Sequence, residues 1–125
     1  EGCGMAVRRF AAITGLVFLL LGLYGYIDPG GFGLFHLGGA HNVIHLIVGL
    51  LGLAASFGEG YAQRYSQVVG VLYLLLAVLG VFTGNLFGLM RLGLADNALH
   101  FVVGAIALYF GFVLTESAQG ARSYR

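Results

Sequence analysis

Four apolar segments, each long enough to cross a bilayer as a helix, constrain the fold of this chain more than any other feature. They occupy residues 9–27, 40–57, 65–83 and 95–114. A helix needs about 20 residues to cross the hydrocarbon core, and open strands in lipid would leave backbone groups unpaired. Only 9% of the 125 residues are charged and 59% are hydrophobic, whereas soluble domains carry about 25% charged residues. The segments therefore predict an all-α, integral membrane four-helix bundle.

An internal repeat of 55 residues organises these segments. Residues 9–58 align with residues 64–113 without a gap, and 18 of the 50 aligned positions are identical. The matches include polar residues that are rare in this chain, which favours duplication over compositional bias. Each copy contains two apolar segments and enters the membrane from the same side. We therefore expect two tandem transmembrane hairpins, related by a pseudo-two-fold axis along the membrane normal.

The hairpins leave three shorter regions, predicted as an N-terminal segment at 1–8, a cytoplasmic loop at 59–63 and a polar cytoplasmic tail at 114–125. Met5 followed by Arg8 and Arg9 resembles a natural start, so residues 1–4 are interpreted as an added remnant. Arginines concentrate near these three regions, and the positive-inside rule then places both termini in the cytoplasm. The chain is therefore expected to be a multi-pass membrane protein. A net charge of +1 without a basic run argues against nucleic acid as a partner.

Two polar motifs interrupt the apolar segments, HNxxH at residues 41–45 and DNxxH at residues 96–100. Residues three positions apart share a helix face, and the repeat places His45 and His100 at the same depth. A polar side chain in hydrocarbon is costly unless it is paired. One interpretation is structural: Asn42 and Asn97, or the two histidines, hydrogen-bond across the axis and hold the hairpins together.

A second interpretation of the motifs is cofactor binding. His45 and His100 are candidates for binding a haem or a chlorophyll-like ring, with Asn42 and Asn97 beside them. A glycine follows each histidine by four positions and shares its helix face, which would leave room for a ring.

A third interpretation is a transition-metal or proton site. His41 and His45 are four residues apart and share a face, and Asp96 and His100 are their counterparts in the second copy. Imidazole and carboxylate groups together form a mixed nitrogen and oxygen ligand set. His41, His45, Asp96 and His100 are therefore the candidate metal ligands.

No catalytic constellation accompanies these motifs. The sequence shows no phosphate-binding glycine loop and no nucleophile with a paired base, which favours a non-enzymatic protein. The expected function is an accessory subunit or scaffold, with a His/Asn cluster near the outer face. Its glycine and alanine faces would contact a larger membrane complex or a second copy of the chain. The alternative is a protein that binds a cofactor or a metal through His45 and His100.

The same motifs carry a resemblance to a known family. HNxxH at 41–45, the block YSQVVGVLYLL at 65–75 and DNxxH at 96–100 resemble a family of small bacterial four-span membrane proteins known as a domain of unknown function. Members occur in actinobacteria and cyanobacteria, and the resemblance covers about residues 8–112. It implies a four-helix membrane bundle in a bacterial inner membrane, of plasma or thylakoid type, and it implies no activity.

Overall fold

The computed structural model describes residues 2–114, which form four α-helices joined by short segments. The helices are α1 (Gly2–Ile27), α2 (Ala40–Ala55), α3 (Glu59–Phe82) and α4 (Leu94–Leu108). The segment between α1 and α2 contains a 3-10 turn, and α3 and α4 are joined by a small antiparallel hairpin of β1 (Asn85–Leu86) and β2 (Met90–Arg91). A π-helical segment, Tyr109–Leu114, extends α4. The predicted all-α class is confirmed, and the two short strands were not predicted.

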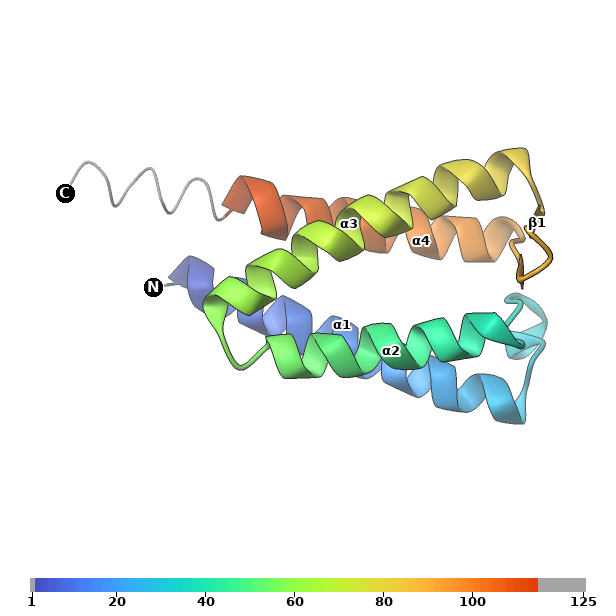
Figure 1. Cartoon of the computed structure of the whole chain (residues 1–125), viewed down its shortest axis with the longest axis horizontal. Coiled ribbons are helices and arrows are strands. Elements are labelled where there is room, and N and C mark those ends of the chain that lie inside the picture. Colours follow the sequence, from blue (N-terminus) through green and yellow to red (C-terminus); the bar gives the residue numbers. More distant parts are fainter. Residues whose placement is uncertain (1, 115–125) are drawn as a thin grey trace.

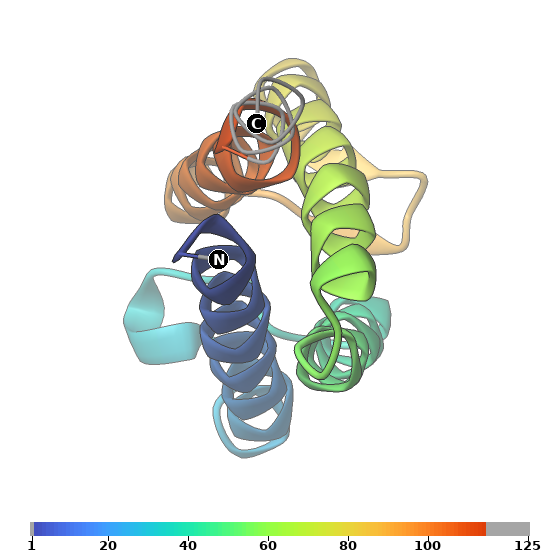
Figure 2. The same ribbon diagram turned by 90° about the vertical axis from the view of Figure 1, so that its left-hand side faces the viewer.

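The helices pack in two pairs, α1 with α2 and α3 with α4 (Figure 1). Both connecting loops, residues 28–39 and 83–93, lie at one end of the molecule, which we call the loop end. The N-terminus lies at the opposite end, together with the last described turn of the chain. Viewed from that opposite end, the four helices surround a common core (Figure 2). The two pairs correspond to the two copies of the repeat.

Three of the helical segments are long and apolar enough to cross a membrane, judged by length and composition. They are Gly4–Ile27, Glu59–Phe82 and Leu94–Leu114. Many large apolar side chains on the outside are exposed, among them Ile13 at 64% and Val81 at 74%. Such a surface requires an apolar solvent, and it indicates an integral multi-pass membrane protein. With 16 residues, α2 is shorter and reaches only about 24 Å.

Two boundaries differ from the prediction. Residues 59–63 were expected to form a loop, and this is wrong because α3 already begins at Glu59. An acidic side chain is favourable in the first turn of a helix, and Gln63 and Arg64 are good helix formers. These polar residues therefore mark where the chain leaves the apolar layer, while helix α3 extends beyond that layer to Glu59. At the N-terminus, α1 begins at Gly2, inside the predicted segment 1–8. Of the tail predicted at 114–125, Leu114 ends the π-helical segment, and residues 115–125 lie outside the described residues.

Close approach of the helix backbones holds each pair together. A Cβ atom added to Gly49 would lie 2.5 Å from the backbone nitrogen of Leu19 in α1. A Cβ added to Gly104 would lie 2.8 Å from the backbone nitrogen of Leu74 in α3. The two contacts are equivalent under the 55-residue repeat, so both copies use the same packing. The backbone of the neighbouring helix occupies the space beside Gly49 and Gly104. These two glycines therefore leave no room for a ring. They also do not form the partner-facing surface expected from the sequence.

The loop end is built from two differently folded segments. In the second loop, Leu86, Met90 and Leu92 are buried and pack against Ile44 and Leu76. This apolar loop therefore folds over the mouth of the helical bundle. Burial of these side chains couples the second loop to α2 of the first pair, close to the histidines described below.

Asp28 organises the first loop. Its carboxylate accepts hydrogen bonds from the backbone N–H groups of Phe32 at 2.9 Å and Gly30 at 3.1 Å, and from the Tyr24 hydroxyl at 3.1 Å. The bond from Phe32, with smaller contributions from the others, lowers the pKa of Asp28 below its ordinary value. The ring of Phe32 stacks on the ring of Tyr24. The backbone of Phe32 has a positive φ of 61°. The carboxylate thus stabilises a strained turn.

Candidate metal centre

Three histidines from two helices meet inside the bundle, near the loop end. His41 and His45 come from α2 and His100 comes from α4. One nitrogen of each imidazole can be chosen so that the three atoms lie within 4.8 Å of one another. The side chains are 2%, 1% and 0% exposed. The structure therefore brings together three of the four residues predicted as metal ligands, from both copies of the repeat.

The nitrogens of this three-histidine cluster are largely without partners. Neither ring nitrogen of His45 or of His100 has a hydrogen-bond partner within residues 2–114, and the same is true of His41 Nε2. A buried polar atom without a partner costs about 1–3 kcal/mol, and buried polar atoms in proteins are nearly always satisfied. The hydrogen bond between His45 and His100 that a purely structural role would require is absent from this part of the chain. Five buried ring nitrogens in this cluster thus lack partners among the described residues, which makes it a candidate ligand site.

His41 is oriented by a hydrogen bond on the side of its ring away from Nε2. Its Nδ1 lies 2.8 Å from the backbone carbonyl oxygen of His36 in the first loop. A carbonyl oxygen can only accept, so Nδ1 carries the hydrogen. In the neutral ring, Nε2 then holds a free lone pair. Metal-binding histidines usually donate their second N–H in this way, and His41 is therefore prepared to act as a ligand.

Aromatic rings enclose the cluster from within the bundle. Phe18 of α1 contacts the His45 ring with 5.1 Å between centroids, and Tyr73 of α3 contacts His100 at 5.0 Å. The two aromatic rings also touch each other, at 5.1 Å. Phe18 and Tyr73 occupy equivalent positions in the two copies of the repeat. All four helices thus contribute to an apolar environment around the imidazoles.

Asp96, the fourth predicted ligand, binds a different partner. Its Oδ2 lies 2.7 Å from Nδ1 of His36 and accepts a hydrogen bond from the backbone N–H of Gly93 at 3.0 Å. Its Oδ1 accepts a bond from the backbone N–H of His36 at 3.1 Å. The carboxylate is 1% exposed, whereas the side chain of His36 is 48% exposed. Asp96 therefore binds His36 and the start of α4, and it is not a member of the three-histidine cluster. Sequence reasoning did not find the role of His36, which depends on how the first loop folds over α4.

The two asparagines of the motifs also lie away from each other. The Oδ1 atom of Asn42 is directed at Gly25 of α1, and that of Asn97 is directed at Gly80 of α3. Each asparagine thus contacts the partner helix of its own pair, in matching positions of the repeat. Both Oδ1 atoms are buried without a hydrogen-bond partner in the described chain. The predicted Asn42–Asn97 hydrogen bond is not present.

These features define a class: a helical multi-pass membrane protein with a buried cluster of three histidines. The chain belongs to the family described as Domain of unknown function (DUF4383), whose sequence profile matches residues 8–113. No curated protein and no solved structure shows a significant match to the chain. The family description names no activity, so a functional proposal depends on the geometry of the site.

Proposed function

We propose that this protein binds a divalent transition-metal ion through His41, His45 and His100. The observation that supports the proposal is the convergence of three buried imidazoles whose nitrogens lie within 4.8 Å and mostly lack partners. In a tetrahedral zinc site, with Zn–N distances of about 2.0–2.1 Å, ligand nitrogens are about 3.3 Å apart. Small side-chain rotations that move the ring nitrogens closer together by roughly 1–2 Å would bring the cluster to that geometry.

The donor set restricts the kind of ion. Imidazole nitrogen suits zinc, copper, iron and nickel, whereas calcium and magnesium prefer oxygen ligands. Three protein ligands leave a fourth position for water or another small ligand, as in catalytic zinc sites. The carboxylate of Asp96 already accepts three hydrogen bonds from His36 and Gly93, and its oxygens are not part of the group of atoms within 4.8 Å. We therefore propose a three-histidine site in place of the mixed set of four.

A single ion suits this arrangement better than a haem or chlorophyll-like ring. A haem or chlorophyll-like ring between His45 and His100 would need a flat slot. The imidazole of His41 stands in the way, because its ring centroid lies 4.2 Å from that of His45 and 5.5 Å from that of His100. Phe18 fills the space on another side of His45. The glycine faces that suggested a scaffold are used inside the chain, so assembly with a partner loses that support.

The placement in the membrane is part of the same proposal. With both termini in the cytoplasm, as the arginines indicate, the loop end and the metal site lie toward the outer face of a bacterial inner membrane. The two helix pairs would be related by a pseudo-two-fold axis along the membrane normal. The ion would then sit close to the membrane surface, beneath the two loops.

Metal titration of the detergent-purified protein tests the proposal. The protein is stripped with a chelator and titrated with Co²⁺, whose visible absorption reports its coordination. We expect one tetrahedral Co²⁺ per chain, displaced by Zn²⁺, and loss of the signal in His45→Ala and His100→Ala. Val43→Ala is the matched control, because Val43 lies between two ligands on α2 and its side chain is 47% exposed.

Three results would contradict the proposal. The first is a wild-type protein that binds no Co²⁺ or Zn²⁺, and the second is binding that survives both histidine substitutions. The third is a Soret band in the protein purified from its native host, which would favour the ring instead. Elemental analysis of that preparation identifies the bound metal.

A further inference from the structure

The hydrogen-bonded pair of His36 and Asp96 connects the first loop to the start of α4, and it lies next to the three-histidine cluster. We infer that this pair positions His41 for metal binding, an inference that rests on the proposed metal site. Its elements are a carboxylate from the second copy of the repeat, a loop histidine from the first copy, and the ligand His41.

The connection runs through three consecutive contacts. Asp96 is fixed at the first turn of α4, where it accepts the backbone N–H of Gly93 at 3.0 Å. It then holds His36 twice, through the backbone N–H at 3.1 Å and through Nδ1 at 2.7 Å. The carbonyl oxygen of His36 in turn accepts the Nδ1–H of His41 at 2.8 Å. Holding His36 at two points therefore fixes the carbonyl group that orients His41.

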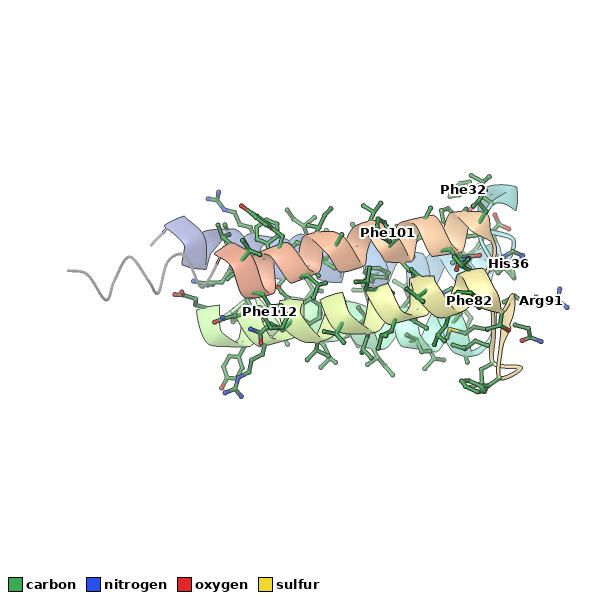
Figure 3. All side chains as sticks on the ribbon, turned by 90° about the horizontal axis from the view of Figure 1, so that it is seen from above. Phe32, His36, Phe82, Arg91, Phe101 and Phe112 are labelled. Carbon is green, nitrogen blue, oxygen red and sulfur yellow. The ribbon has the colours of Figure 1, made fainter. Side chains whose placement is uncertain are left out.

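The pair has no counterpart elsewhere in the repeat. Under the 55-residue alignment, Asp96 is equivalent to His41 and Arg91 is equivalent to His36. The first copy thus supplies a ligand at the position where the second copy supplies the carboxylate that positions it. Figure 3 places His36 and Arg91 at the same end of the molecule. Both line a cavity of about 470 Å³ between the two loops, but no hydrogen bond links Arg91 to the cluster among the described contacts.

The burial of Asp96 supports a dedicated role. A carboxylate that is 1% exposed is costly to bury unless it is paired, and here every bond that it makes serves the loop or the helix start. Removing outer-shell partners of metal ligands typically weakens metal binding by about 10–100-fold. The carboxylate acts through His41 and is a positioning group, since the cluster of atoms within 4.8 Å is formed by the three histidines without it.

Four variants test this inference in the full-length protein, with Co²⁺ and Zn²⁺ as probes. Asp96→Ala removes all three acceptor contacts, and Asp96→Asn keeps one oxygen, which can accept either the bond made at Oδ1 or the two made at Oδ2. His36→Ala removes only the imidazole contact, because its backbone N–H and carbonyl remain. Arg91→Gln, at the equivalent position of the other loop, is the control. Circular dichroism of the metal-free proteins reports their folding.

We expect Asp96→Ala to weaken Zn²⁺ binding by about 10–100-fold, His36→Ala and Asp96→Asn to weaken it less, and Arg91→Gln to leave it unchanged. The Co²⁺ absorption bands should also shift in the Asp96 variants, which a purely structural role would not cause. Wild-type affinity and an unshifted spectrum in folded Asp96→Asn and His36→Ala would overturn the inference while leaving the metal site intact. Absence of binding in the wild type would instead overturn the proposed function itself.

Discussion

Substituting Gly49 with alanine should separate α1 from α2 and destabilise the fold. The added Cβ would lie 2.5 Å from Leu19 N, 2.7 Å from Leu19 Cα and 2.8 Å from Gly15 O. These are all backbone atoms, so no side chain can rotate away. Ordinary contact begins at about 3.4 Å, so the helices must move apart by roughly 0.9 Å. A gap of that size forfeits between a quarter and a half of each dispersion contact, and overpacking costs about 1–3 kcal/mol.

The assay is thermal unfolding in detergent, followed by circular dichroism because the chain has no Trp. At roughly 4 °C per kcal/mol, we expect a decrease in Tm of about 4–12 °C. Gly104→Ala should cost less, because its closest contact is 2.8 Å. The control is Gly60→Ala in the first turn of α3, where a Cβ meets nothing within 4 Å and alanine favours a helix by about 1 kcal/mol. An unchanged Tm for Gly49→Ala would refute the close packing of α1 on α2.

Two other substitutions test single polar groups. The bonds from Phe32 and its neighbours lower the pKa of Asp28, so their stabilisation is complete above the ordinary carboxyl pKa of 3.8 and is lost as the pH falls through the lower folded-state value. Asp28→Asn should therefore reduce the loss of Tm in acid, and an identical acid profile would contradict this. Tyr73 carries a buried hydroxyl without a partner in the described chain. Tyr73→Phe should therefore raise the unfolding free energy by about 1 kcal/mol, and a loss of stability in the same melts would show that the hydroxyl is bonded.

The apolar segments were sufficient to predict the four helices, because length and hydropathy determine what can cross a bilayer. The ends of the helices were harder to predict, since polarity and helix formation are separate properties. Glu59 and Arg64 are polar and still helical. The small strands at Asn85–Leu86 and Met90–Arg91 are only two residues each, too short to produce an alternating pattern.

The repeat predicted which residues share a depth in the two copies, and it explains why His45 and His100 occupy equivalent positions. It could not predict which side chains face each other across the pairs. Asn42 contacts its own hairpin through Gly25, whereas His41 contacts the other copy through the ring of His100. The contact between Asp96 and His36 could not be predicted for a related reason. The two residues are 60 positions apart, and His36 belongs to a loop whose path depends on the folded structure.

The most direct test of the proposed metal centre is X-ray absorption at the zinc K-edge, measured on the purified protein loaded with one equivalent of Zn²⁺. The proposal predicts three imidazole nitrogens at about 2.0–2.1 Å and one further light ligand. The outer-shell scattering of imidazole rings should decrease from three rings to two in His100→Ala. A first shell of six oxygens without imidazole scattering would contradict a metal site formed by His41, His45 and His100.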